Sequence, residues 1–148
     1  MSIFKWGKEK REKEFLQQTQ QMASKVLELI KEKTGKDFED TTEMERQITA
    51  VFVFGMANGL AMDIKHTPLE VETGMIKILI SIFKYSPKQA SDFIKDMITS
   101  LQTKNKNDTK HAIIHRGLDG YYSYQNSKFE QLGDNIINII NRLSRSRY

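Results

Sequence analysis

The chain has 148 residues, of which 39% are hydrophobic and 28% are charged. At this length one hydrophobic core can support the fold without cross-links. The absence of cysteine excludes disulfides, thiolate zinc sites, iron–sulfur clusters and a cysteine nucleophile. With two prolines and eight glycines, the composition argues against a β-protein with many tight turns, and a net charge of +4 is low for a dedicated nucleic-acid binder.

The first two predicted helices have clear boundaries. Apolar residues recur every three or four positions over about residues 8–33, and Gly35 can adopt the left-handed conformation that ends a helix. Thr42 and Glu45 form a capping box at the start of a second helix. That helix is apolar on nearly every face between residues 48 and 64, which is typical of a central, buried helix.

Two glycines of this second helix, Gly55 and Gly59, are four residues apart. Each lowers helix propensity by about 1 kcal/mol, so we expect them to mark the close approach of another helix. Because the segment also contains Asn58 and ends beside Asp63, we interpret it as a core helix rather than a membrane span. The start of the chain does not resemble a signal peptide, and we expect a soluble cytoplasmic protein.

The remaining helices are predicted from their start signals and apolar spacing. TPLE at residues 67–70 and SPKQ at residues 86–89 each supply an N-cap, a first-turn proline and a capping-box side chain. A polar loop over residues 103–109 precedes a short helix at about 110–118 and a last helix at about 128–143. The sequence therefore predicts an all-α single domain over residues 1–148, a bundle of five to six antiparallel helices.

Both ends of the chain are basic. Residues 1–7 form an arm that is either docked or flexible, and residues 144–148 a flexible basic tail. The arm carries three apolar residues, which either dock onto the bundle, as we favour, or touch a membrane surface: Ile3, Phe4 and Trp6. The basic ends also permit a small nucleic-acid-binding regulator. Against it, lysines alternate with glutamates over residues 8–14, as on a solvated helix face.

The sequence offers little support for catalysis or metal binding. His111, His115 and Asp119 are spaced four residues apart, and two histidines at this spacing can hold zinc. However, Ala112 occupies the position of the zinc-protease glutamate, and we expect Gly117 to end the helix before Asp119. The sequence lacks a nucleophile elbow and a phosphate-binding glycine loop. We therefore expect no enzymatic activity, no metal and no cofactor.

The segment over residues 111–124 is the strongest candidate for partner binding, because tyrosine and arginine often anchor protein interfaces. Five residues of its predicted turn form the candidate site: His115, Arg116, Asp119, Tyr121 and Tyr122. An alternative is equally open, in which Arg116 and Asp119 pair to brace the turn while the tyrosines are half-buried. A second candidate surface is acidic and suits a basic partner: Asp37, Glu39, Asp40 and Glu43.

Three stretches resemble a known family. These are AIIHRGLDGYY at residues 112–122, RQITAVFVFGMANG at residues 46–59 and SPKQA at residues 86–90, and they resemble the immunity protein 48 family. That family consists of small helical proteins encoded beside bacterial polymorphic toxins. The resemblance implies neutralisation of a cognate toxin by binding in the cytoplasm, and it carries over no catalytic residue. It does not indicate the toxin's activity or the oligomeric state of the chain.

Overall fold

The computed structural model describes residues 3–102 and 108–145, with the side chains of residues 7–102 and 108–144. Over these residues the chain forms six α-helices, one short 3-10 helix and no strand, which confirms the all-α prediction. The elements in chain order are α1 (Ile3–Thr34), η1 (Phe38–Asp40), α2 (Glu43–Ile64), α3 (Pro68–Ser81), α4 (Pro87–Gln102), α5 (Thr109–Gln125) and α6 (Phe129–Arg145).

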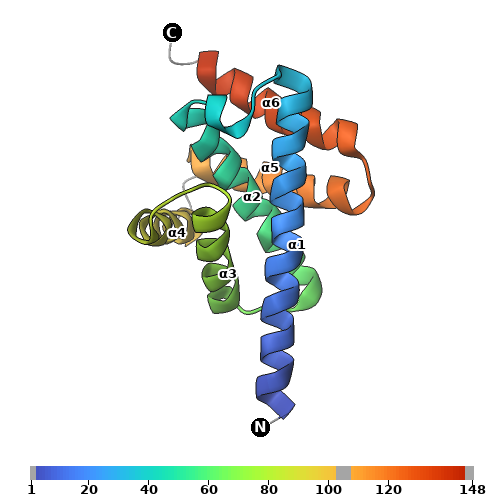
Figure 1. The fold of residues 1–148 in the computed structure, drawn as a ribbon, viewed down its shortest axis with the longest axis vertical. Helices are drawn as coiled ribbons and strands as arrows, with labels where there is room; N and C mark the ends of the chain where they lie inside the picture. Colours follow the sequence, from blue (N-terminus) through green and yellow to red (C-terminus); the bar gives the residue numbers. More distant parts are fainter. Residues whose placement is uncertain (1–2, 103–107, 146–148) are drawn as a thin grey trace.

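The first three α-helices run alternately up and down, and the last three lie across them (Figure 1). Helix α1 is the longest and crosses the whole front of the molecule in this view, while α4 is seen nearly end-on. Helices α5 and α6 form an antiparallel hairpin behind α1. This arrangement leaves one side of the α5–α6 hairpin facing solvent, on the side opposite α1.

The helices begin where the predicted start signals lie. At the start of α2, Thr42 N donates to Glu45 Oε1 at 2.9 Å and Glu45 N donates to Thr42 Oγ1 at 3.1 Å. Thr67 and Glu70 form the same reciprocal pair before α3. The SPKQ signal likewise forms both of its hydrogen bonds at the start of α4. Gly35 has a φ of +76° and follows α1, as predicted.

Helix α2 forms the centre of the core. Its side chains are buried almost continuously from residue 48 to residue 61, and Phe52 and Leu60 are among the largest fully buried side chains. Within the described residues, α2 is long and apolar enough to span a membrane by length and composition alone. Most of it is enclosed by the other helices, which is the environment of a buried core helix.

Helix α5 is longer than predicted. We expected Gly117 to end a helix over residues 110–118, but α5 continues through Gly117 and Gly120 to Gln125, so the predicted turn does not form. The reason is a close crossing with α2. A Cβ atom on Gly117 would lie 2.2 Å from the Phe52 carbonyl oxygen, and one on Gly55 would lie 2.2 Å from the Ile114 carbonyl oxygen. The glycines therefore allow two backbones to touch, as we predicted for Gly55.

Two predictions concern the ends of the chain. The backbone of α1 begins at Ile3, but the side chains of residues 1–6 lie outside the described part, so the docking of the apolar trio is not addressed. At the other end, α6 includes Ser144 and ends at Arg145. Residues 146–148 and residues 103–107 of the expected polar loop also lie outside the described residues.

Candidate functional site: the groove between α5 and α6

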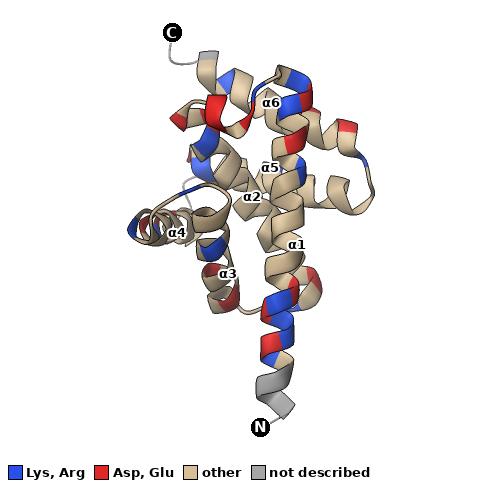
Figure 2. Ribbon diagram, in the orientation of Figure 1, with Lys and Arg blue, Asp and Glu red and all other residues tan. Residues whose placement is uncertain are grey.

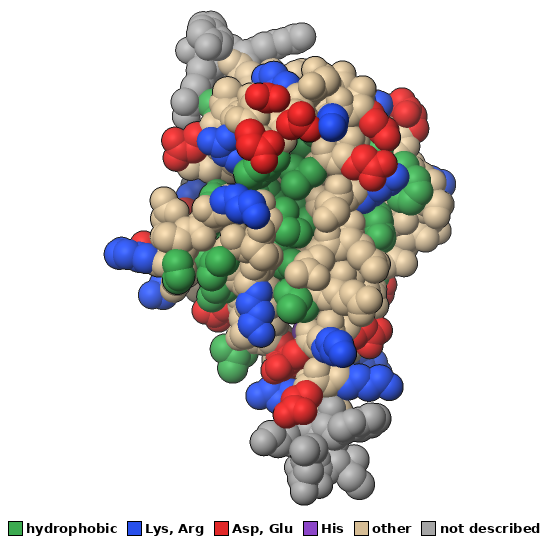
Figure 3. All heavy atoms as spheres, in the orientation of Figure 1, with side chains coloured by type: hydrophobic (Ala, Val, Ile, Leu, Met, Phe, Trp, Pro, Cys, Tyr) green, Lys and Arg blue, Asp and Glu red, His purple; other side chains and the backbone are tan. Residues whose placement is uncertain are grey.

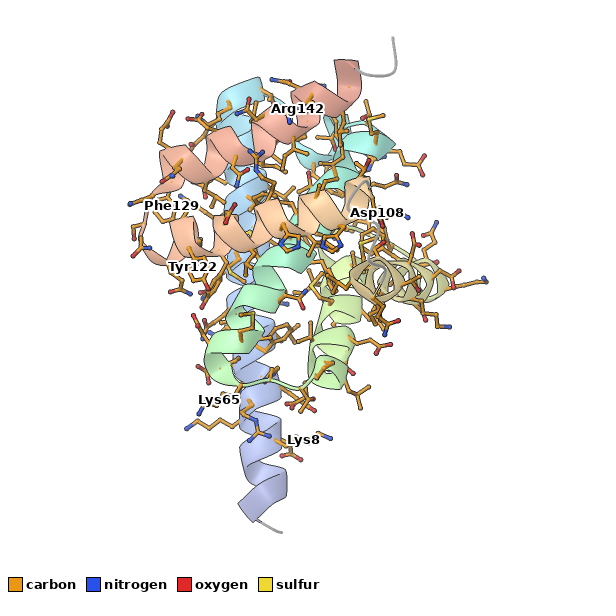
Figure 4. All side chains as sticks on the ribbon, turned by 180° about the vertical axis from the view of Figure 1, so that it is seen from behind. Lys8, Lys65, Asp108, Tyr122, Phe129 and Arg142 are labelled. Carbon is orange, nitrogen blue, oxygen red and sulfur yellow. The ribbon has the colours of Figure 1, made fainter. Side chains whose placement is uncertain are left out.

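The hairpin of α5 and α6 presents a groove to solvent. Seen from behind, the two helices run side by side, with Tyr122 and Phe129 near the closed end and Asp108 and Arg142 near the open end (Figure 4). The side of α5 that carries Gly117 packs on α2. The groove is therefore formed by the remaining sides of α5 and α6.

The groove at the closed end has a volume of about 540 Å³. From α5 and its C-cap it is lined by Arg116, Asp119, Tyr122, Ser123 and Asn126. From the start and body of α6 it is lined by Lys128, Gln131, Asp134, Asn135 and Asn138. We call this the α5–α6 groove. It contains three of the five residues that the sequence singled out, namely Arg116, Asp119 and Tyr122.

A reciprocal pair of hydrogen bonds crosses the groove. The Arg116 guanidinium Nε donates to Asn135 Oδ1 at 2.6 Å, and Asn135 Nδ2 donates to the Arg116 carbonyl oxygen at 3.0 Å. Asp119, which we considered as the partner of Arg116, forms no ion pair with it within the described residues. The guanidinium thus donates to one acceptor, and its other N–H groups have no partner among the residues that the structure describes.

The two adjacent tyrosines point in different directions. Tyr122 is 48% exposed and lines the groove. Tyr121 is 2% exposed and donates its hydroxyl to Asp63 Oδ2 at 2.5 Å. Burial, together with this hydrogen bond, raises the pKa of the Tyr121 phenol well above its ordinary value. Because Tyr121 belongs to the core of the folded chain, we remove it from the candidate contact residues.

His115 lies outside the groove and pairs with another histidine. His111 and His115 are four residues apart on α5 and share one side of the helix. Their rings stack with centroids 4.5 Å apart, and their Nε2 atoms are 2.7 Å apart, a hydrogen-bond distance. No group of three metal-ligating side chains occurs within residues 7–102 and 108–144. We interpret this histidine pair as a hydrogen-bonded contact that one shared proton can satisfy.

The predicted acidic surface lies where α1 ends and α2 begins. Asp37 is paired with Lys31 at 2.9 Å, and the contact raises the pKa of the lysine. Glu39 and Asp40 are exposed on η1, and Glu43 lies in the first turn of α2. Figures 2 and 3 show that acidic and basic side chains are mixed at this upper end of the molecule, while apolar side chains collect along the seam between α1 and α3.

The groove is polar and nearly balanced in charge. Two cations, Arg116 and Lys128, and two carboxylates, Asp119 and Asp134, line it, and the other lining side chains are mostly amides and hydroxyls. Lys33 of α1 pairs with Glu130 and with Asp134 of α6, each at 2.9 Å, and these contacts raise the pKa of Lys33. What such a surface offers is directed hydrogen bonds rather than a net charge.

Sequence reasoning missed the α6 half of the groove. Asn135 and Asn138 lie one turn apart, between the apolar residues that face the core. Asparagine has low helix propensity, so its repetition at helical spacing on a solvated face is a signal that these positions have another role.

A comparison with protein-family models identifies the family. The model described as immunity protein 48 matches residues 15–144 of the chain. The chain therefore belongs to the immunity protein 48 family, as the resemblance implied. Comparison with curated proteins and with solved structures gave no match.

Proposed function

We propose that this member of the immunity protein 48 family binds the toxin domain of one cognate polymorphic toxin and neutralises it without catalysis, in the cytoplasm of the cell that makes both. The α5–α6 groove is the proposed contact surface. The observation that supports this surface most directly is the Arg116–Asn135 pair, which holds a guanidinium in a solvent-open groove with N–H donors to spare.

The groove has the chemistry of a recognition surface. The Arg116 guanidinium can form a two-pronged contact with a carboxylate or with carbonyl groups of a toxin loop. Tyr122 adds a large, partly apolar surface with few rotatable bonds to immobilise. Amide side chains such as Asn138 can donate and accept at once, which suits the polar backbone of an exposed loop. Binding of this kind neutralises an enzyme by covering its active site or by holding an inactive form.

The first experiment asks whether a toxin is the partner. The chain is expressed with the toxin domain encoded beside its gene, and growth of the host is followed. An affinity pull-down is made with and without nuclease. We expect the chain to restore growth and to retain the toxin domain after nuclease treatment. Recovery of nucleic acid without a protein partner would instead support a small nucleic-acid-binding regulator.

The second experiment asks whether the groove is the contact surface. Truncating a hot-spot residue costs about 2 kcal/mol or more, so Tyr122→Ala should weaken toxin binding by about 30-fold. Met62 is 65% exposed and lies outside the groove, so Met62→Ala is a matched control that should leave the affinity unchanged. Thermal unfolding of both variants is measured beside binding.

Arg116→Ala separates bracing from recognition. Loss of the Asn135 contact alone should lower stability by about 1 kcal/mol. Asn135→Ala removes the same contact and leaves the guanidinium in place, so its affinity should fall less than that of Arg116→Ala. If both variants lose stability while the folded fractions bind the toxin equally well, the groove is not the contact surface. The acidic segment from Asp37 to Glu43 would then be tested in its place.

A further inference from the structure

The α5–α6 groove is too small to be a complete protein interface. It is lined by ten residues, whereas an ordinary stable interface uses roughly 20–30 residues on each side. If the groove contacts a toxin, as proposed above, the contact must continue onto a neighbouring surface. The inference below therefore rests on the proposed function and asks where the rest of the interface lies.

Further hollows continue from the open end of the groove. A small hollow of about 180 Å³ shares Arg116 and Asn138 with the groove. It shares Ile113 and Leu143 with a larger hollow of about 460 Å³ between α2, α4, α5 and α6. In Figure 4 this region lies around Asp108, where α5 begins beside the end of α6 and above α4. The larger hollow in turn adjoins a third, of about 480 Å³, between α2 and α4.

The hollow between the four helices is mainly apolar, and we call it the apolar hollow. Its apolar lining consists of Met44, Ile48, Val51, Met97, Ile113 and Leu143, together with Phe93. Asp96, Lys110 and Gln47 lie at its polar part. In a hollow with an apolar floor and polar groups at its edge, one large apolar side chain of a partner contributes most to the binding free energy, because the surrounding groups keep water away from it.

The third hollow combines acidic and aromatic side chains, and we call it the acidic hollow. Tyr85 and Phe93 pack edge to face with ring centroids 5.7 Å apart, and Glu43, Asp92 and Asp96 line the same hollow. Burial and then the charge of Glu43 raise the pKa of Tyr85. Carboxylates beside aromatic rings are a favourable environment for a lysine or arginine side chain.

Of the carboxylates in the acidic hollow, Asp96 already pairs with Lys110, so Glu43 and Asp92 are the ones that a partner cation can approach. Arg46 donates to the Thr41 carbonyl oxygen at 2.6 Å and lies over the Phe38 ring, so it is used within the fold. Lys88 pairs with Asp92 at 3.2 Å, with both side chains exposed. An exposed pair of this kind contributes little to stability, so a partner cation can replace the lysine. Glu43 has no ion pair within the described part of the chain; it accepts only a 3.4 Å hydrogen bond from Gln47.

We propose that the apolar and acidic hollows form the second half of the toxin interface. They take a single toxin segment that presents a large apolar side chain next to a lysine or arginine. The apolar side chain occupies the hollow between α2, α4, α5 and α6, and the cation lies beside Phe93, between Glu43 and Asp92. The polar loop bound in the α5–α6 groove and this amphipathic segment then cover one continuous surface.

Filling the hollows tests the proposal without removing a core side chain. Gln47 is exposed and lines both hollows, so the side chain of Gln47→Trp would occupy the space proposed for the toxin. We expect toxin affinity to fall by about 30-fold with the melting temperature unchanged. Gln17 is exposed on α1 and lines a different hollow, so Gln17→Trp is the matched control and should bind normally.

A neutral double variant tests the charge separately. The double variant of Glu43→Gln and Asp92→Asn keeps the shape of both side chains and removes two negative charges. Its association with the toxin domain should be about tenfold slower than that of the wild-type chain at low salt. The probe in both tests is the toxin domain encoded beside this gene, separated from its complex with the full chain. If Tyr122→Ala weakens binding while Gln47→Trp and the double variant do not, this inference is wrong and the proposed function stands. If the wild-type chain does not bind the toxin domain, both are wrong.

Discussion

Replacing Gly117 by alanine tests the crossing of α2 and α5 that places the groove at the surface. A Cβ atom at this position would lie 2.2 Å from the Phe52 carbonyl oxygen, whereas ordinary Cβ contacts are 3.4–4 Å. The opposing atom is backbone, so the contact cannot be relieved by a change of rotamer. The two helices must separate by roughly 1 Å, and a gap of that size forfeits a quarter to a half of the dispersion attraction between facing atoms.

The expected magnitude is the balance of two effects. Alanine raises helix propensity by about 1 kcal/mol over glycine, while overpacking a filled interior costs about 1–3 kcal/mol and occasionally more. Because backbone meets backbone, we expect the upper end of that range and a net destabilisation of about 2 kcal/mol. For a chain of this size the melting temperature should fall by about 4–8 °C. Thermal unfolding followed by circular dichroism at 222 nm measures it.

Gly7→Ala is the control for the same chemical change without the crossing. Gly7 is also helical, and its added Cβ atom would meet only Arg11 Nη1, at 3.6 Å. The melting temperature of the Gly7→Ala variant should stay constant or rise. The double variant of Gly55→Ala and Gly117→Ala should lose less stability than the sum of the losses of the two single variants, because one separation of the helices relieves both clashes. A Gly117→Ala protein as stable as Gly7→Ala would refute the close crossing.

Three further measurements check other parts of the structure. Hydrogen bonds outweigh burial and lower the pKa of the capping-box carboxylates Glu45 and Glu70, so the stability they supply is present above their ordinary pKa near 4.5. It should be lost as the pH falls below that value, and Glu45→Gln should reduce this acid sensitivity in urea titrations. Tyr121→Phe should cost about 1 kcal/mol at neutral pH. Because the pKa of Tyr121 is raised in the folded state, its contribution should be fully present below its ordinary pKa of about 10 and be lost progressively as the pH rises above that value. The unfolding transition should be insensitive to EDTA, and a transition that broadens with chelator would indicate a metal at the histidine pair.

The sequence by itself determined where α2, α3 and α4 begin, whereas α1, which carries no capping signal, begins at Ile3 rather than at about residue 8. The capping signals at Thr42, Thr67 and Ser86 depend on hydrogen bonds between residues three apart, so neighbouring residues contain all the required information. The same holds for the end of α1 at Gly35, whose φ is +76°. Apolar periodicity identified the core faces of α1, α3 and α6 because that spacing follows from the geometry of the helix itself.

Only the tertiary structure decided which side chains reach the surface of α5. A glycine inside a helix lowers its propensity by about 1 kcal/mol, so the local sequence predicted that α5 ends at Gly117. Contact with the α2 backbone stabilises the continued helix, in which Tyr121 points into the core and Tyr122 points to solvent. Arg116 likewise takes its partner, Asn135, from 19 residues away rather than from its own helix. These outcomes depend on how closely two helices approach, a distance that the packing of the whole core sets and that no local pattern contains.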